Sequence, residues 1–263
     1  DVRVISPNGD EDWAYDSIKT ISWYSAGTID NVKIEYTYDG VEYHLIKAVA
    51  NTGSTTWQVP DHVSDVCRVR ISDAINSLAE DVSDGPFNIV PTYTLLTPNT
   101  GDELWIVKET HEITWSCVGA VQNVRLDFST DGVNFDHVIT ASTLNDGSYE
   151  WEVADAISET VKVRVGSALS PEAYDASDNN FKIKGKIVVK SPNGSELWKI
   201  SESKAITWET TGTVPRVTVS CSLNGLSGPF VAVANGTNIV NNNSLTWSVP
   251  DSRTPSAMIR VEN

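Results

Sequence analysis

The chain has 263 residues, a formal net charge of −16 and a pI near 4.5. This acidic balance argues against nucleic-acid binding, which needs a basic surface, and against docking on anionic lipid. No apolar run approaches the roughly 18 residues that a membrane-spanning helix requires, so we expect no direct insertion into a membrane.

The first 90 residues alternate polar and apolar side chains over short runs that turn residues separate, which is the pattern of half-buried β-strands. Pro7, Asn8 and Gly9 form the first turn, because proline fixes φ and glycine adopts a positive φ at little cost. Asp39-Gly40 is a two-residue hairpin signal. Seven strands are expected, over residues 2–6, 19–24, 32–38, 43–48, 55–59, 66–72 and 85–90.

The same motif occurs three times along the chain. A Ser/Thr-Pro-Asn turn precedes two tryptophans ten residues apart, at Trp13 and Trp23, Trp105 and Trp115, and Trp198 and Trp208. The repeat length of 92 to 93 residues is longer than the roughly 20–50 residues of solenoid repeats and close to the roughly 100 of an immunoglobulin sandwich. We therefore predict an all-β chain of three tandem immunoglobulin- or fibronectin-like antiparallel β-sandwiches, over residues 1–91, 92–184 and 185–263. With almost no linker between repeats, the array is expected to be a semi-rigid rod.

Charge is distributed unequally over the repeats. Residues 1–90 and residues 91–184 each carry 15 acidic and 6 basic side chains, whereas residues 185–263 carry 5 and 7. The predicted rod is therefore electrically polar, and its near-neutral end could approach the acidic end of another copy.

The third repeat stops early. Phe87 and Phe181 lie in the expected final strands of the first two repeats, thirty residues after the last tryptophan, whereas Asn263 lies only sixteen residues after Trp247. We expect the third sandwich to lack its final strand, which exposes unpaired backbone groups and a groove into the core. Three explanations stay open: the natural chain continues, a strand of another chain fills the gap by strand addition, or the end domain has six strands.

The motif string resembles a known family. It comprises Ser-Pro-Asn-Gly-x-Glu-x-Trp, Ile-Thr-Trp, a strand ending in Asp-Gly, Asn-Asp-Gly-Ser-Tyr-x-Trp-x-Val and Asp-x-Ser-Asp-x-x-Phe-x-Ile, and it resembles the N-terminal domain of the Ser-Thr-rich, glycolipid-anchored fungal cell-wall family. The resemblance covers two repeats and most of the third. It implies an immunoglobulin- or fibronectin-like fold. It also implies a place among cell-wall, adhesive and surface-layer proteins, tandem repeats of secreted bacterial and archaeal proteins, or accessory domains of secreted enzymes.

Most tryptophans are expected in the cores rather than on a sugar-binding platform, because they share strand faces with Ile or Val. These are Trp23, Trp57, Trp115, Trp151, Trp208 and Trp247. The remaining three, Trp13, Trp105 and Trp198, precede a strand in a less regular segment, and they too are expected in the cores. Candidates for an exposed aromatic surface that binds glycans are Tyr15, Tyr24, Tyr38 and Tyr43.

Calcium is the one candidate cofactor. Asp81 and Asp84 in the first repeat correspond to Asp175 and Asp178 in the second, each pair beside a serine, and calcium takes about six to eight oxygen ligands. The competing interpretation, which we favour, is that these Asp and Ser side chains hydrogen-bond their own backbone to start the final strand. Calcium that bridges carboxylates at the joints between acidic repeats is a further hypothesis.

Other short motifs carry less chemistry. N-glycosylation sequons begin at Asn193, Asn235 and Asn242, all in the third repeat. The three cysteines, one per repeat at non-equivalent positions, are interpreted as small buried hydrophobes rather than disulfide partners. The four histidines have no metal-ligand spacing, and the serines form no nucleophile elbow or repeated triad. An enzyme is therefore not expected.

These features together favour a secreted, non-enzymatic protein of the cell surface or cell wall, a subunit or segment of a surface layer, sheath or filament. Its expected partners are further copies of itself or neighbouring surface proteins, with strand addition at the third repeat, and glycans after those. The alternative is a carbohydrate-binding adhesin or an accessory module of a larger secreted hydrolase.

Overall fold

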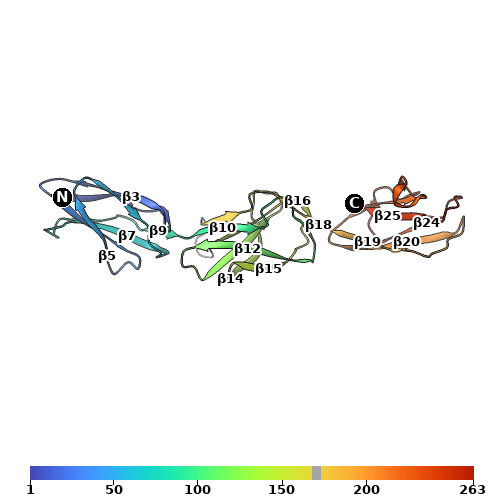
Figure 1. The fold of residues 1–263 in the computed structure, drawn as a ribbon, viewed down its shortest axis with the longest axis horizontal. Helices are drawn as coiled ribbons and strands as arrows, with labels where there is room; N and C mark the ends of the chain where they lie inside the picture. Colours follow the sequence, from blue (N-terminus) through green and yellow to red (C-terminus); the bar gives the residue numbers. More distant parts are fainter. Residues whose placement is uncertain (168–172) are drawn as a thin grey trace.

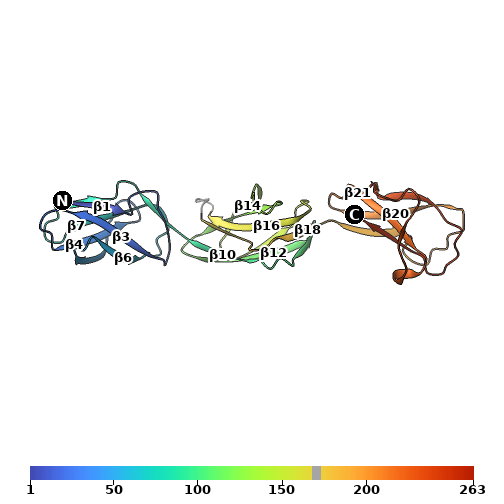
Figure 2. The same cartoon turned by 90° about the horizontal axis from the view of Figure 1, so that it is seen from above.

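The computed structural model describes residues 1–167 and 173–263. Within these residues the chain forms three β-sandwiches, here called sandwiches 1, 2 and 3, which follow one another along one axis (Figure 1). The view turned by 90° has the same end-to-end order (Figure 2). Every sheet of the described chain takes its strands from one sandwich only. The predicted fold class, an all-β chain of tandem immunoglobulin- or fibronectin-like sandwiches, is confirmed.

Sandwich 1 contains two sheets. One has the strand order β1-β3-β6, and the other has the order β2-β9-β7-β4-β5 with β8 added to β7. The strands are β1 (Val2–Ser6), β2 (Asp12–Ala14), β3 (Ile18–Ser25), β4 (Asn31–Thr37), β5 (His44–Ala50), β6 (Ser54–Gln58), β7 (Ser64–Asp73), β8 (Glu80–Val82) and β9 (Phe87–Val90). Strand β2 pairs with β9 in parallel. All seven expected strands appear, with ends within two residues of the prediction, and β2 and β8 are additional.

Sandwich 2 repeats this topology, with β10-β12-β15 in one sheet and β11-β18-β16-β13-β14 in the other, β17 being added to β16. Its strands are β10 (Thr92–Thr97), β11 (Leu104–Ile106), β12 (Thr110–Val118), β13 (Asn123–Ser129), β14 (His137–Leu144), β15 (Ser148–Glu152), β16 (Ser158–Ser167), β17 (Tyr174–Ala176) and β18 (Phe181–Lys184). In both sandwiches the Pro turn directs the chain from one sheet to the other, so β1 and β2, like β10 and β11, lie on opposite sides of the core.

Sandwich 3 has the first sheet, β19-β20-β24, and a reduced second sheet in which β22, β23 and β25 pair with β21. The strands are β19 (Lys186–Ser191), β20 (Ser203–Thr211), β21 (Arg216–Ser222), β22 (Val231–Ala232), β23 (Ile239–Val240), β24 (Ser244–Ser248) and β25 (Met258–Glu262), and η1 (Gly225–Ser227) is a short 3-10 helix. Strand β25 corresponds to β7 and β16. The described part of sandwich 3 has no counterpart of β2, β8 or β9. The absence of the final strand was expected from the early end of the repeat.

A partly buried hydrogen bond fixes one tryptophan in each core. The indole Nε1 of Trp23 donates to Asn51 Oδ1, that of Trp115 to Asn145 Oδ1, and that of Trp208 to Asn241 Oδ1, each at 2.8 Å. An indole N–H inside the protein needs such a partner. Asn51, Asn145 and Asn241 therefore have the same structural role in the three repeats, as acceptors for the tryptophan.

The recurring arginine of each repeat, thirteen residues after the last tryptophan, pairs with a buried acid in two sandwiches. Arg70 Nη2 lies 2.9 Å from Glu35 Oε2, and Arg164 Nη2 lies 3.1 Å from Asp127 Oδ2. Burial opposes ionisation of Glu35, but hydrogen bonds from Lys33 and Arg70 outweigh it and lower the pKa of this carboxyl. The corresponding residue of sandwich 3 is the buried Ser220, so this sandwich has no buried acid at that place.

Candidate functional site

The predicted core tryptophans lie between the sheets. Five of them, Trp23, Trp57, Trp115, Trp151 and Trp208, are at most 8% exposed, as are Trp13 and Trp105. Trp247 and Trp198 are only partly buried. The two tryptophans that remain accessible are thus both in sandwich 3.

The candidate glycan-binding tyrosines do not share one platform. Tyr24 is 56% exposed, whereas Tyr15, Tyr38 and Tyr43 are partly buried. Tyr43 lies under the guanidinium of Arg70, 4.0 Å from its ring centre. Tyr38 is stacked on His62, with ring centres 4.0 Å apart. Each of these two contacts covers one face of the tyrosine ring.

The candidate calcium carboxylates connect strands instead of facing one another. Asp81 Oδ2 accepts the Val4 N–H at 2.8 Å, and Asp175 Oδ2 accepts the Leu95 N–H at 2.7 Å. Asp81 thereby connects β8 to β1, and Asp175 connects β17 to β10, across the two sheets of each sandwich. The favoured interpretation, a hydrogen bond to the residues' own backbone, was wrong, because the backbone partner belongs to a distant strand.

The second aspartate of each pair closes the turn that begins the repeat. Asp84 Oδ2 accepts from Asn8 Nδ2 at 2.9 Å, while the Asp84 N–H donates to Asn8 Oδ1 at 2.7 Å. Asp178 and Asn99 make the same reciprocal pair. Within residues 1–167 and 173–263 no group of three or more His, Cys, Asp or Glu side chains is placed to hold a metal ion. The geometry therefore supports a structural role for these four carboxylates.

The Pro-Asn turn is held by a glutamate in every repeat. Glu11, Glu103 and Glu196 accept backbone N–H bonds from the turn residues that precede them. Burial of Glu103 opposes its ionisation, but the N–H groups of Thr100 and Asn99 dominate and lower the pKa of this carboxyl to about 2. Sequence reasoning recognised the turn but not its acceptor.

The three sequon asparagines, Asn193, Asn235 and Asn242, are exposed, so their glycosylation stays a prediction. Of the cysteines, Cys67 is buried, while Cys117 and Cys221 are partly buried, and all three are free thiols. Burial raises the pKa of the Cys221 thiol. Its side chain lines a hollow of sandwich 3, which is described below.

The joint between sandwiches 1 and 2 is short and specific. Asp61, four residues after Trp57, accepts the backbone N–H of Ala120 at 2.8 Å. The preceding Gly119, at φ +114°, approaches the backbone of sandwich 1 so closely that a Cβ there would lie 3.2 Å from Pro91 Cβ and 3.3 Å from Val63 Cγ2. The glycine is required both by its φ and by this contact.

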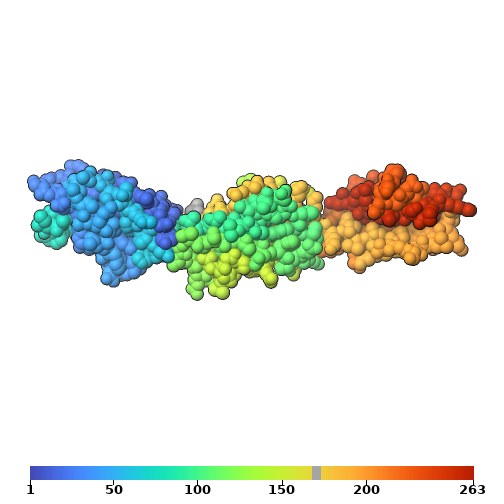
Figure 3. All heavy atoms as spheres, viewed as in Figure 1, coloured from blue at the N-terminus to red at the C-terminus, as the bar shows by residue number. Residues whose placement is uncertain are grey.

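The joint between sandwiches 2 and 3 is built from the equivalent residues. Asp155, four residues after Trp151, accepts the N–H of Thr213 at 2.8 Å and its hydroxyl at 2.6 Å. A Cβ on Gly212 would lie 3.0 Å from Val107 Cγ2, and one on Gly185 would lie 2.6 Å from Val214 Cγ2. The two joints share the acceptor, the donor loop and the close-packed glycine, and the second joint also has an ion pair between Lys186 Nζ and Glu109 Oε1, 3.7 Å apart. The sandwiches touch only at their ends (Figure 3).

The signal for these joints was present in the sequence as a repeated aspartate after the last Trp-x-Val. Asp61, Asp155 and Asp251 stand at equivalent places, and a glycine recurs four residues after the second tryptophan, at Gly27, Gly119 and Gly212. At the two joints, Asp61 contacts the loop of Gly119 and Asp155 contacts the loop of Gly212. The hypothesis of calcium between neighbouring carboxylates at the joints overlooked this, because the partner of each aspartate is a backbone N–H and has no sequence signature.

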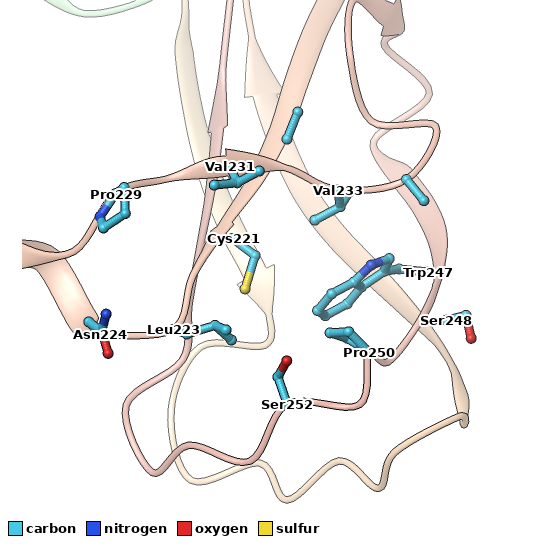
Figure 4. A pocket seen from close by; sticks show the side chains of 12 residues that line it. Cys221, Leu223, Asn224, Pro229, Val231, Val233, Trp247, Ser248, Pro250 and Ser252 are labelled. Carbon is cyan, nitrogen blue, oxygen red and sulfur yellow. The ribbon is translucent and has the colours of Figure 1, made fainter.

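The accessible edge of sandwich 3 carries a long groove with a volume of about 820 Å³. Its lining includes Trp198, Trp247, Cys221, Met258 and Ile259 from both sheets. A smaller hollow of about 440 Å³ adjoins it and shares Cys221 and Trp247. Figure 4 shows the side chains of Cys221, Leu223, Trp247 and Pro250 gathered in this hollow beside Val233. The core of sandwich 3 is thus open along one side.

Comparison with known proteins adds little about function. No family model and no curated protein matches the chain. Among solved structures it is similar to fibronectin(III)-like modules of CbhA from Clostridium thermocellum, at 17% identity over 69% of this chain and 94% of that chain, with a TM-score of 0.25. It is also similar to an I-band fragment of titin, at 14% identity over 100% and 92% of the two chains and a TM-score of 0.33. The three N-terminal domains of the outer capsid protein Hoc of bacteriophage RB49 give 12% identity over 94% and 86% and a TM-score of 0.28.

At these identities and TM-scores the similarities carry no argument about function, and the fold assignment rests on the strand pairing itself. The resemblance to the fungal cell-wall family stays a proposal. No helix in the described part of the chain is long and apolar enough to span a membrane.

Proposed function

We propose that the protein is a non-enzymatic extracellular structural protein, a subunit or segment of a cell-surface layer, sheath or filament, in which the sandwiches act as spacers of fixed relative orientation. The observation that carries this proposal is the repeated joint, in which Asp61 and Asp155 each accept a backbone N–H of the next sandwich. A flexible string of domains would not need a specific acceptor at every junction.

The joints affect the relative orientation of neighbouring sandwiches more than the free energy of unfolding. Both aspartates are exposed, and a solvated hydrogen bond of this kind contributes only about 1 kcal/mol. Only Pro91 and Gly185 connect the final strand of one sandwich to the first strand of the next. This short connection, the hydrogen bond and the close packing at Gly119 and Gly212 act together to favour one angle. A defined angle is what a lattice or filament subunit requires of its spacers.

The joint is tested by small-angle X-ray scattering on the whole protein and on the Asp155→Ala variant. We expect the variant to keep its melting behaviour within about 1 kcal/mol and to show a broader distribution of interatomic distances, because sandwich 3 loses its fixed angle. The matched control is Asp146→Ala, which removes an exposed aspartate outside the joint. A wild-type protein as flexible as the Asp155 variant would contradict the proposal.

Assembly is tested by negative-stain imaging over a range of protein and calcium concentrations. Ordered sheets or fibres are expected, and monomers that remain dispersed under all conditions would count against a lattice role. A glycan array addresses the alternative of a carbohydrate-binding adhesin or hydrolase accessory module, since a spacer needs to bind no glycan.

A further inference from the structure

The basic side chains of sandwich 2 lie almost entirely on one sheet face. Residues 91–184 contain six Lys and Arg residues, and five of them are on β13, β16 and β18, which are neighbours in the larger sheet. They alternate along these strands with core residues such as Leu126, Val163 and Ile183, so their side chains lie on the outer side of the sheet. The five residues, here called the basic face, are Arg125, Lys162, Arg164, Lys182 and Lys184.

Two arginines of the basic face share a single carboxylate. Arg125 Nη2 lies 2.8 Å from Asp127 Oδ1, and Arg164 Nη2 lies 3.1 Å from Asp127 Oδ2. The guanidinium of Arg164 also lies 5.0 Å from the ring centre of Phe135 and 5.2 Å from that of Tyr174. These contacts hold the two guanidinium groups in place, while one carboxylate balances only one of their two positive charges.

The three lysines of the basic face are likewise in excess over carboxylates. Lys182 Nζ and Lys184 Nζ lie 2.9 and 3.2 Å from the two oxygens of Glu159, and Lys162 Nζ donates to the backbone carbonyl of Asp178 at 3.1 Å. The side chains of Lys182 and Lys184 are 47% and 46% exposed. The basic face is therefore positively charged and accessible, although its repeat carries 15 acidic and 6 basic side chains.

The opposite face of the same sandwich is acidic. The strands of the smaller sheet, β10, β12 and β15, contain no Lys or Arg. Three exposed glutamates on β12 and β15 alternate with the core residues Ile113, Trp151 and Val153, which places the glutamates on the outer side of this sheet. The three residues, here called the acidic face, are Glu112, Glu150 and Glu152.

Two members of the acidic face repel each other. Glu112 and Glu150 are directly opposite in the antiparallel pair of β12 and β15, and like charges at such positions destabilise a sheet. The equivalent positions are Thr20 opposite Thr56 in sandwich 1, and in sandwich 3 they are likewise uncharged. The glutamate pair is thus a local cost within sandwich 2 alone, and a cationic partner on this face would offset it.

The hydrophobic core of sandwich 2 separates the two faces, so they cannot pair within one molecule. We propose that the basic face of one molecule packs against the acidic face of a second copy of this chain, and that this lateral contact joins neighbouring molecules side by side. Because the two surfaces differ, each added copy leaves one face of either kind free, and the contact extends into a layer instead of closing as a dimer. This inference rests on the proposed structural role and names the contact that builds the layer.

Sedimentation velocity of the whole protein over a range of concentrations tests the contact. We expect oligomers at about 20 mM salt that dissociate at about 0.5 M, because salt screens charges on exposed surfaces. Lys182→Glu and Glu150→Lys should each weaken the association about tenfold or more. Glu150→Lys also removes the like-charge pair with Glu112, so its melting temperature should not fall. The matched control is Lys108→Glu, at the exposed sixth basic residue outside the basic face, and it should leave the association unchanged.

Mixing the two variants identifies the partner surface. The Glu150→Lys variant keeps the native basic face and the Lys182→Glu variant keeps the native acidic face, so the mixture restores one native contact. We expect complexes of the two variants at concentrations where neither associates alone. A mixture without complexes would overturn the proposal. So would a wild type that stays monomeric at low salt, or an association that Lys182→Glu weakens and Glu150→Lys does not, since another acidic surface would then occupy the basic face.

Imaging separates failure of this contact from failure of the proposed function. Ordered layers that form equally well in the wild type and in the Lys182→Glu variant would overturn the contact and leave the structural role in place. The scattering test of the joints is independent of both outcomes, because it is made on the monomer.

Discussion

Sandwiches 2 and 3 share a sequence motif and differ in how deeply the tryptophans of that motif are buried. Sandwich 2 has sixteen buried hydrophobic residues in one cluster and sandwich 3 has six, counted over the described residues. Trp105 and Trp151 are at most 6% exposed, while their counterparts Trp198 and Trp247 are partly buried. Alternation of polar and apolar residues places a side chain on the core face of a strand, but this is not enough to bury it. Burial also needs the final strand, which is β18 in sandwich 2.

The difference extends to polar interactions. Asp127 of sandwich 2 is 1% exposed and pairs with Arg125 and Arg164. In sandwich 3 the arginine is kept as Arg260 but pairs with Glu262 on the surface. A solvent-exposed pair of this kind contributes little to stability, so sandwich 3 lacks both the apolar cover and the inner ion pair of its neighbour.

The largest expected effect comes from removing the Phe181 ring, which packs on the tryptophans of sandwich 2. Phe181→Ala should destabilise this sandwich by about 3–5 kcal/mol, because a fully buried ring is lost and a cavity remains. Hydrogen exchange followed by mass spectrometry reports each sandwich separately, and exchange should rise in sandwich 2 alone. Should the alanine variant not fold, Phe181→Leu is expected to cost about 1 kcal/mol.

The control for this prediction is Val133→Ala, since Val133 is 74% exposed and its truncation should change exchange little. If sandwich 2 of the Phe181 variant exchanged as slowly as the wild type, the final strand would not be what separates the two sandwiches.

An intermediate effect is expected from exchanging the inner acid between the two sandwiches. Asp127→Ser gives sandwich 2 the residue of sandwich 3 and should cost about 2 kcal/mol, the order of a charge-assisted hydrogen bond. The reverse change, Ser220→Asp, should add less, because it has Arg260 as a partner but no counterpart of Arg125. Chemical unfolding of both variants and the wild type measures the two changes in the free energy of unfolding. Changes of equal size and opposite sign would contradict the prediction.

The smallest effect concerns acid stability at the Pro-Asn turn. Because the folded-state pKa of Glu103 is lowered to about 2, the stabilisation from its charged form is present above its ordinary value near 4.5 and is lost as the pH falls toward about 2. Glu103→Gln should therefore be less stable than the wild type by about 1 kcal/mol at pH 7, with the gap closing as the pH falls. Glu196 in sandwich 3 has a lowered pKa for the same reason, backbone N–H bonds from Asn193, but it is exposed and Glu196→Gln should show a smaller gap. A gap that is constant with pH would contradict this.

The sequence predicted the regular part of this fold well, for reasons visible in particular residues. The alternation from residue 32 to 38 and the Asp39-Gly40 turn are local signals, and β4 and β5 form on either side of that turn. The early end of the third repeat followed from counting residues after Trp247. The short strands β2 and β8 were not predicted, because each has three residues and forms only by pairing with β9 or β7.

The candidate site was harder to predict because its partners are backbone groups. The Asp61 acceptor could be found as a repeated residue, but the Ala120 N–H that it binds is chemically identical to any other amide. Asp81 and Asp175 were recognised as equivalent and were given calcium or local backbone as partners, whereas the contact is with the first strand, 77 residues away in sandwich 1. Contacts between residues so far apart in the sequence depend on how the two sheets pack, and local sequence patterns do not predict them.

The joint has a consequence for how such chains are put together. Each sandwich carries its own acceptor at one pole, Asp61, Asp155 or Asp251, and its own Gly-containing loop at the other. A gene duplication that copies one repeat therefore copies both halves of the connector with it, the aspartate acceptor and the glycine loop.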